Sequence, residues 1–274
     1  MSEAMPDSPL TQPTYFIPHG AGPCFFMNWN PANTWQQMAA FLRGIESDLP
    51  APPTAILLIS AHWQDDAFAL TAAAKPDLIF DYFGFPEATY QLTYPAPGAP
   101  ELAAAIAERI SAAGLPSRLE QSRGFDHGVF IPLKLMFAKA EISVVQLSLQ
   151  RGLDASAHLQ LGTALAPLRE QGVLIVGSGM SFHNMRGYGD PRYTAPSEIF
   201  DRWLTDAVQA EPATRYALLQ QWQTAPHAID CHPRGAEEHL LPLMVVAGAA
   251  GAANGRKVYS ENVLRTQLSA FRFG

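Results

Sequence analysis

Short runs of consecutive apolar residues recur along the chain and alternate with longer amphipathic stretches. An uninterrupted apolar run bounded by polar, Gly or Pro positions is typical of a strand in a sheet that is covered on both faces. The pattern predicts five such strands: Tyr15–Pro18, Ala55–Ser60, Ala67–Ala73, Ser143–Leu147 and Val173–Gly177.

The stretches between these runs carry helical periodicity. Ala99–Ala113 shows the expected signals, with Pro100 at its start and Gly114 at its end. Strands that alternate with helices predict an α/β fold, here a single domain over residues 14–274 with a central, largely parallel or mixed sheet flanked by helices. Residues 1–13 are expected to form a loosely ordered tail. The predicted helices are Thr34–Glu46, Ala99–Ala113, Ser156–Gln171, Ser197–Gln209, Pro212–Gln223 and Gly235–Ala247.

Composition narrows the classes of function. The 274 residues are 48% hydrophobic and 16% charged, and the net charge is −7. Without a basic run, the chain lacks the Lys and Arg patches that bind nucleic acid. Two cysteines make no disulfide framework, so a cytoplasmic location is the default expectation. The N-terminus has no signal-peptide pattern, and the apolar stretch Leu240–Ala253 is too short to span a membrane.

One irregular stretch, Asp81–Pro100, is rich in aromatic residues set among glycines and prolines. Long loops in compact domains are often binding loops or lids. A structural loop anchored by its aromatic side chains explains the same pattern, so both interpretations stay open. The aromatic residues are Phe83, Phe85, Tyr90 and Tyr94.

The eight histidines are the most informative feature of the sequence. His19, His62 and His183 each follow a predicted strand. Ligands of open α/β sheets bind beyond the carboxyl ends of the strands, so these imidazoles are expected to converge there. Neutral imidazole is the commonest side-chain metal ligand, and the repeated pattern therefore predicts a metal site.

The other histidines are weaker candidates. His239 lies near the start of a predicted helix and could reach the same site, and His127 lies in an expected turn where the neighbouring Asp126 could orient or charge its ring. His158 is expected on a helix surface. His232 either lines the site or shapes a turn, and His227 lacks a suggestive context.

Two motifs that would indicate a different function do not match the sequence. Gly177-Ser178-Gly179-Met180-Ser181-Phe182 begins like a dinucleotide-binding loop but has Phe where Gly or Ala is required. The same segment is not a Gly-x-Ser-x-Gly nucleophile elbow. The sequence also contains no P-loop and no His-Glu-x-x-His motif.

Several motifs together resemble the class III extradiol ring-cleavage dioxygenase superfamily (LigB-like), in particular its 4,5-DOPA dioxygenase-type branch. They run in the same order from about residue 15 to the C-terminal region. The matching segments are Pro18-His19-Gly20-Ala21-Gly22-Pro23, Ser60-Ala61-His62-Trp63, Tyr82-Phe83-Gly84-Phe85-Pro86, Tyr94-Pro95-Ala96-Pro97-Gly98, Gly124-Phe125-Asp126-His127-Gly128, His183-Asn184 and Glu238-His239-Leu240-Leu241-Pro242-Leu243.

The resemblance implies a non-haem metal held by His19, His62 and His239, with His183 either joining the metal or lying beside it. It implies that His127 is the acid/base residue, with His183 as the second catalytic candidate. Family enzymes use iron(II) for activity, but zinc stays open as the bound metal because an all-histidine shell suits both ions. Many members of the superfamily use a carboxylate as third ligand, where this chain has His239 beside Glu238.

The function implied is the insertion of both atoms of O₂ into a catechol-type aromatic substrate with opening of the ring. Trp63, Phe83 and Phe85 are expected to wall an apolar pocket for the planar substrate. The expected partners are this small aromatic molecule and O₂, with neither nucleic acid nor membrane, and a homo-oligomer is left open. Two alternatives remain, a zinc-dependent hydrolase and a non-enzymatic, Memo-like binding protein on the same fold.

Overall fold

The sheet at the centre of the molecule has eight strands in the order β4-β3-β5-β2-β6-β1-β8-β7. It is seen in a computed structural model that describes residues 10–274. The strands are β1 (Thr14–Pro18), β2 (Ala55–Asp65), β3 (Phe68–Thr71), β4 (Ser117–Glu120), β5 (Val144–Gln150), β6 (Val173–Gly179), β7 (Gly255–Val263) and β8 (Thr266–Phe273).

The middle of this sheet is parallel. β2 pairs in parallel with both β5 and β6, and β6 pairs in parallel with β1. The flanking β8 runs antiparallel to β1, and β3 runs antiparallel to β5. The carboxyl ends of the four central strands therefore meet at one edge of the sheet, and the predicted α/β fold with a mixed sheet is confirmed.

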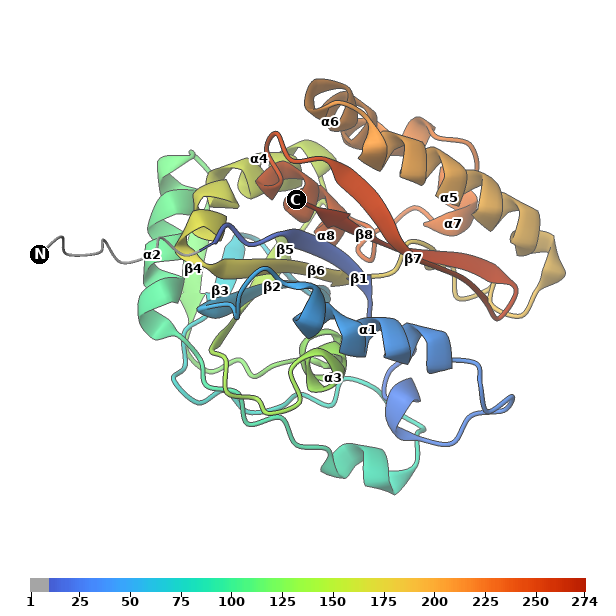
Figure 1. The fold of residues 1–274 in the computed structure, drawn as a ribbon, viewed down its shortest axis with the longest axis horizontal. Helices are drawn as coiled ribbons and strands as arrows, with labels where there is room; N and C mark the ends of the chain where they lie inside the picture. Colours follow the sequence, from blue (N-terminus) through green and yellow to red (C-terminus); the bar gives the residue numbers. More distant parts are fainter. Residues whose placement is uncertain (1–9) are drawn as a thin grey trace, which may run out of the picture.

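Helices cover both faces of the sheet (Figure 1). On one side, α3 packs against β2 and β6, and α1 packs against α3. On the other side, α8 packs against β1, β2 and β6 beneath α4, while α5 covers β7 and β8. The α-helices are α1 (Gln36–Asp48), α2 (Pro100–Ala112), α3 (His127–Met136), α4 (Ala155–Leu165), α5 (Thr194–Gln209), α6 (Pro212–Gln220), α7 (Ala228–Cys231) and α8 (Leu241–Ala249).

All five predicted strands are present, but β4, β7 and β8 are additional. The predicted helix Gly235–Ala247 was placed too early, because α8 begins only at Leu241. The turn expected around His127 is wrong as well. His127 is the first residue of α3, which runs on through Pro132.

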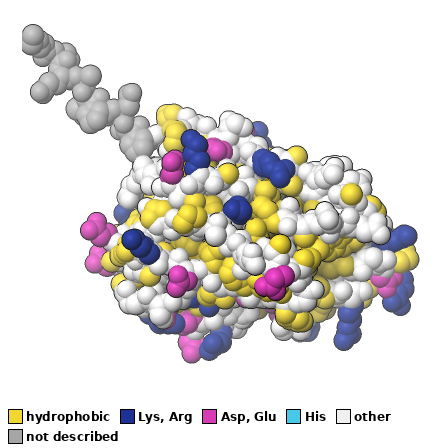
Figure 2. Space-filling model, turned by 90° about the horizontal axis from the view of Figure 1, so that it is seen from below, with side chains coloured by type: hydrophobic (Ala, Val, Ile, Leu, Met, Phe, Trp, Pro, Cys, Tyr) yellow, Lys and Arg dark blue, Asp and Glu magenta, His cyan; other side chains and the backbone are white. Residues whose placement is uncertain are grey.

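The expected tail over residues 1–13 lies partly outside the described residues, which begin at residue 10. Gln12 is buried, and its side-chain amide donates to the Ala51 carbonyl at 2.9 Å. Within residues 10–274, no helix combines the length and apolarity needed to cross a bilayer. On the face drawn in Figure 2, Lys and Arg side chains are scattered singly among hydrophobic ones rather than gathered into a patch.

Candidate metal centre and active site

His19 directly follows β1 and is buried beneath the edge of the sheet. Ser178 of β6 donates its hydroxyl proton to the Gly128 carbonyl at 2.5 Å. The Ser178 oxygen is then left to accept from His19 Nδ1, which lies 3.1 Å away. This arrangement fixes the His19 tautomer and leaves the lone pair on Nε2, which lies 3.1 Å from His62 Nε2.

His62 lies near the carboxyl end of β2. Because side chains alternate along a strand, His62 shares a face with Ser60, whose hydroxyl accepts from the His62 amide at 3.2 Å. Gly128 lies against the same face, and a Cβ atom there would approach the Ser60 hydroxyl to 2.5 Å. A glycine at this position therefore lets the first turn of α3 lie directly on His62.

His239 comes from the segment that leads into α8, far along the chain from the other two. Its carbonyl accepts from the Met180 amide at 3.0 Å, which ties this segment to the end of β6. A Cβ atom at Gly179 would come within 2.1 Å of that carbonyl oxygen, so only glycine permits the contact. Gly177 and Gly179, which resembled part of a dinucleotide-binding loop in the sequence, instead let the segment of His239 and α8 lie close to the sheet.

Glu238 lies beside the metal candidate His239 and orients it. Glu238 Oε1 accepts from His239 Nδ1 at 2.8 Å, which leaves Nε2 to face the other histidines. Burial raises the pKa of the Glu238 carboxyl. A carboxylate that holds the far nitrogen of a histidine is a common support for metal ligands, because it fixes the tautomer and the ring orientation.

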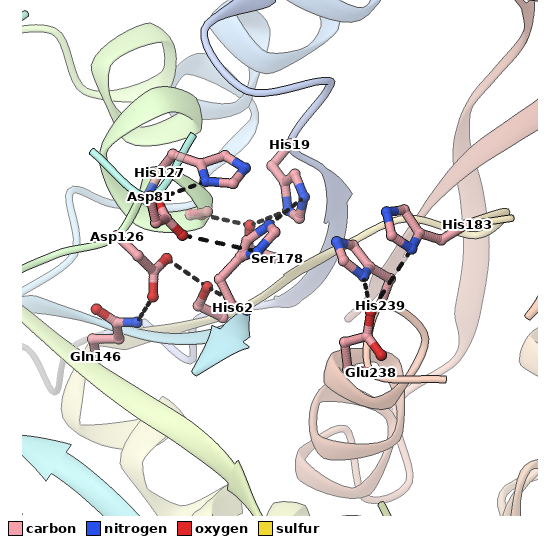
Figure 3. A network of polar contacts seen from close by, with 12 residues as sticks. His19, His62, Asp81, Asp126, His127, Gln146, Ser178, His183, Glu238 and His239 are labelled. Carbon is pink, nitrogen blue, oxygen red and sulfur yellow. Dashed lines mark hydrogen bonds and ion pairs between the residues drawn. The ribbon is translucent and has the colours of Figure 1, made fainter. Parts of the chain in front are cut away.

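The three rings offer nitrogens that lie within 4.8 Å of one another (Figure 3). Burial, followed by the charges of the neighbouring histidines, lowers the pKa of His19 and His239 far below the usual value. Burial likewise lowers the pKa of His62 to about 3. The rings are therefore neutral, as metal ligands must be. His239 Nε2 is buried without a hydrogen-bond partner, which a metal ion would supply. The donor set fits a non-haem metal.

His127 lies beside this cluster, with its ring centroid 3.9 Å from that of His62. Asp81 accepts from the His127 amide at 2.9 Å and from its Nδ1 at 2.8 Å. Burial raises the pKa of the Asp81 carboxyl, but the hydrogen bonds from His127 outweigh burial and the net shift is downward. Asp81 therefore stays ionised, and its contact with Nδ1 leaves Nε2 of His127 on the side of the ring away from the carboxylate.

The sequence suggested that Asp126 could orient this ring, but Asp81 does so instead. Asp126 is fully buried and faces away from the ring, where it accepts from Ser60 at 2.7 Å and from Arg123 at 3.2 Å, and also from Gln146. Burial, and then the charge of Asp81, raises its pKa. Asp126 is the N-cap residue of α3, so this buried network anchors the start of the helix that carries His127.

His183 stacks on His239, with ring centroids 3.3 Å apart and an interplanar angle of 14°. In Figure 3 it lies on the far side of His239 from His127. Its potential metal-binding partners are Glu238 and His239 rather than His19 and His62. Burial, followed by the charges of His62 and His127, lowers its pKa to about 4.

A cavity of about 460 Å³ opens above the histidines. Phe83 and Phe85 line it as expected, but Trp63 does not. Trp63 follows His62 on β2 and so points to the opposite face, where it is buried under Arg123, whose guanidinium lies 4.6 Å from the ring centroid. Several lining residues come from loops and turns and carried no signal in the sequence: Trp29, Trp35, Met180, Met185, Tyr188 and Leu264.

The remaining histidines lie outside the cavity. His158 was expected on the surface but is fully buried; its Nδ1 donates to the Asp154 carbonyl at 2.7 Å and its Nε2 accepts from the Gln150 amide at 3.2 Å. His232 is buried and donates from Nε2 to the Ser181 carbonyl at 2.9 Å, so it shapes the turn and does not line the cavity. His227 is partly exposed and pairs with Asp230.

Known proteins resemble this chain over most of its length. Residues 13–272 match the family described as the catalytic LigB subunit of aromatic ring-opening dioxygenase. A 4,5-DOPA dioxygenase extradiol from Portulaca grandiflora is 40% identical over 82% of this chain and 82% of its own. The protein named dioxygenase tasH from Hapsidospora irregularis is 39% identical over 81% of this chain and 72% of its own.

A bacterial relative and a solved structure agree with these matches. A 4,5-DOPA dioxygenase extradiol from Escherichia coli is 33% identical over 88% of this chain and 86% of its own. The crystal structure of an uncharacterized protein from Escherichia coli K12 superposes with a TM-score of 0.76 at 26% identity, covering 96% of this chain and 100% of that one. The chain therefore belongs to the LigB family of aromatic ring-opening dioxygenases, the class III extradiol enzymes that its motifs resemble.

Proposed function

We propose that this enzyme opens the ring of a catechol-type substrate beside its two hydroxyl groups and inserts both atoms of O₂. One observation carries the proposal: three neutral imidazoles converge within 4.8 Å on the floor of an aromatic cavity that also holds the His127–Asp81 pair. The family match supports the reaction class.

His19, His62 and His239 would hold the metal, with iron(II) as the active ion and zinc as a bound alternative. Three protein ligands leave room for a substrate, and the all-histidine donor set suits both ions. When bound, iron(II) would acidify a catechol hydroxyl and supply the one-electron chemistry that O₂ requires.

His127 would act as the acid/base residue. Its Nε2 lone pair accepts the proton of a catechol hydroxyl, and Asp81 stabilises the positive ring through the hydrogen bond at Nδ1. The same nitrogen returns the proton when the ring opens. His183 stacks on the other side of His239. It would be the second acid/base candidate, for an atom of the substrate or of O₂ bound on that side.

The chemistry balances without an added reductant. The ring C–C bond beside the diol breaks, and one oxygen atom goes to each carbon at the break. The carbon that carried the hydroxyl becomes a carboxylic acid and its neighbour an aldehyde or ketone. All atoms of the catechol and of O₂ are retained in the product, and the electrons for O₂ reduction come from the ring.

The direct test is anaerobic reconstitution with iron(II), followed by addition of a catechol and then of oxygen. A substituted catechol should give a yellow product, with oxygen consumed one for one with substrate. His239→Ala should abolish both signals, while the matched control His227→Asn should retain them, since Asn tolerates the positive φ of 59° found there.

Absence of colour and of oxygen uptake across a broad catechol panel, with iron shown to be bound, would refute the dioxygenase proposal. A zinc-dependent hydrolase or a Memo-like binding protein would then be the better explanation. Turnover of ester or amide substrates by the zinc-loaded protein would identify the hydrolase.

A further inference from the structure

Few ionic groups line the cavity. Among the described residues that form its wall, Asp81 is the only carboxylate, and neither Lys nor Arg is present. Asp81 is already hydrogen-bonded to His127 through both the backbone and the ring. The cavity therefore offers no fixed cation to a carboxylate on a substrate, and its one anionic side chain would repel such a group.

The walls are instead apolar well beyond the metal-binding floor. Trp29, Trp35, Met180 and Leu264 contribute to them. A volume of about 460 Å³ falls in the range of about 300–1,000 Å³ typical of pockets for drug-sized ligands. One aromatic ring with two hydroxyls fills only part of that space, so a substituent has room to extend along the apolar wall.

The rim carries two unusually exposed hydrophobic side chains. Phe83 is 90% exposed and Met185 is 71% exposed, and both line the same cavity. Large apolar side chains gathered at the mouth of a pocket mark a ligand-binding surface more often than chance exposure. They extend the apolar wall outward to the solvent.

We propose that the substrate is a catechol with an uncharged, apolar alkyl or aryl substituent, and that catechols with a carboxylate on the substituent are disfavoured. This inference rests on the ring-cleaving function proposed above. The catechol oxygens would meet the metal on the histidine floor, and the substituent would lie against Trp29, Trp35 and Met180 and leave past Phe83 and Met185.

Two arginines supply the rival explanation. Arg186 follows Met185 in the chain and Arg265 follows Leu264, and both are exposed without lining the cavity. If either side chain reached over the rim, it could pair with a substrate carboxylate. The test must therefore separate an apolar rim from an arginine clamp.

The first experiment measures binding without turnover. Zinc-loaded protein is titrated calorimetrically, under anaerobic conditions, with a 4-alkylcatechol and with a catechol of matched chain length that ends in a carboxylate. The alkyl compound should bind about ten-fold more tightly or better. Its chain end gains about 0.8 kcal/mol, or roughly four-fold, for each buried carbon, whereas burial of the carboxylate without a partner costs free energy. Steady-state cleavage by the iron-loaded enzyme should show the same order.

The binding measurement and the cleavage measurement separate the proposed substrate class from the proposed ring cleavage. Tighter binding of the alkylcatechol without any cleavage by the iron-loaded enzyme would support the apolar substrate class and refute ring cleavage. Tighter binding of the carboxylated compound would overturn the inference, and loss of that advantage in Arg186→Gln or Arg265→Gln would identify the arginine responsible.

A charge placed at the rim gives the complementary test. Met185→Lys and Phe83→Lys should shift the preference toward the carboxylated compound by about two- to five-fold, the effect of a solvent-exposed ion pair. Leu119→Lys is the matched control, because Leu119 is an exposed hydrophobic residue (38%) on edge strand β4 outside the cavity. An equal shift in the control, or none in the rim variants, would contradict the proposed path of the substituent.

Discussion

Asp81 holds His127 by two hydrogen bonds at once, one from the backbone amide at 2.9 Å and one from ring Nδ1 at 2.8 Å. The carboxylate comes from the aromatic loop and the histidine from the first turn of α3. The pair therefore joins two segments distant in sequence and fixes the ring as the Nδ1–H tautomer. A histidine held in this way has one ring nitrogen free, Nε2, and that nitrogen can accept a proton from one direction only.

Replacing His127, the proposed base, should separate catalysis from metal binding. We expect His127→Gln to retain its metal and to lose turnover by about 10²–10⁴-fold, the usual contribution of a general acid/base. Metal analysis and an oxygen-electrode assay on the same sample would measure both quantities. Normal turnover in this variant would move the acid/base role to His183.

Ser178 should act through metal affinity, because its hydroxyl accepts from His19 Nδ1 and so sets the ligand tautomer. We expect Ser178→Ala to weaken zinc binding by about 10–100-fold, the usual effect of losing such a supporting contact. Competition with a chelator would measure the dissociation constant. Ser148→Ala is the control, since that buried serine on β5 bonds only to the Ala67 and Ala69 backbone. Equal affinities in the two variants would argue against the role of Ser178.

Metal binding should stabilise the fold, because the unfolded chain cannot hold three distant histidines together. Zinc at about 100 times its dissociation constant should add about 2.7 kcal/mol to the free energy of unfolding. For a chain of this size, that corresponds to a rise in melting temperature of roughly 5–10 °C. Thermal denaturation with and without a chelator would measure it. A similar rise in His239→Ala would place the ion elsewhere.

Acidification should destabilise the fold partly through His158. Burial lowers its pKa from 6.5 to about 4. Between these values the unfolded ring is protonated and the folded ring neutral, so stability is complete above pH 6.5 and falls toward pH 4. The loss reaches about 3 kcal/mol.

His158→Gln should be less stable near neutral pH, because its two backbone hydrogen bonds are disturbed. Its free energy of unfolding should nevertheless depend less on pH in the acid range, by up to about 1.4 kcal/mol per pH unit, since one proton fewer is taken up on unfolding. Urea titrations at several pH values would show this. Parallel pH profiles for the two proteins would mean that the buried ring does not titrate on unfolding.

Much of the fold and part of the site could be predicted because buried central strands are uniformly apolar. β1, β2 and β6 are such strands, and His19 and His62 mark the edge where two of them end. The hairpin of β7 and β8 was not predicted because its strands carry many polar residues. Its two-residue turn uses Leu264 and Arg265 at positive φ, where Gly or Asn is the usual signal.

The errors within the site have physical causes. Trp63 was expected in the pocket as an aromatic residue, but it neighbours His62 on β2, and neighbours on a strand point to opposite faces. Asp126 was considered because it adjoins His127 in sequence, yet the carboxylate that bonds His127 is that of Asp81, 46 positions away. His158 was mistaken for a surface residue because helix periodicity does not reveal which neighbouring backbone groups require a partner.

The chain separation of the metal candidates has a consequence for the order of folding. His19 directly follows β1 and His239 precedes α8, 220 positions later (239 − 19). Strand β1 itself is seated between β6 and β8, both from the later half of the chain. During synthesis, His19 therefore cannot meet His239, its proposed partner in metal binding, until the segment that leads into α8 has been made. Acquisition of the metal would then mark the completion of folding. Metal content would report the fraction of chains in which β1 has paired with β6 and β8.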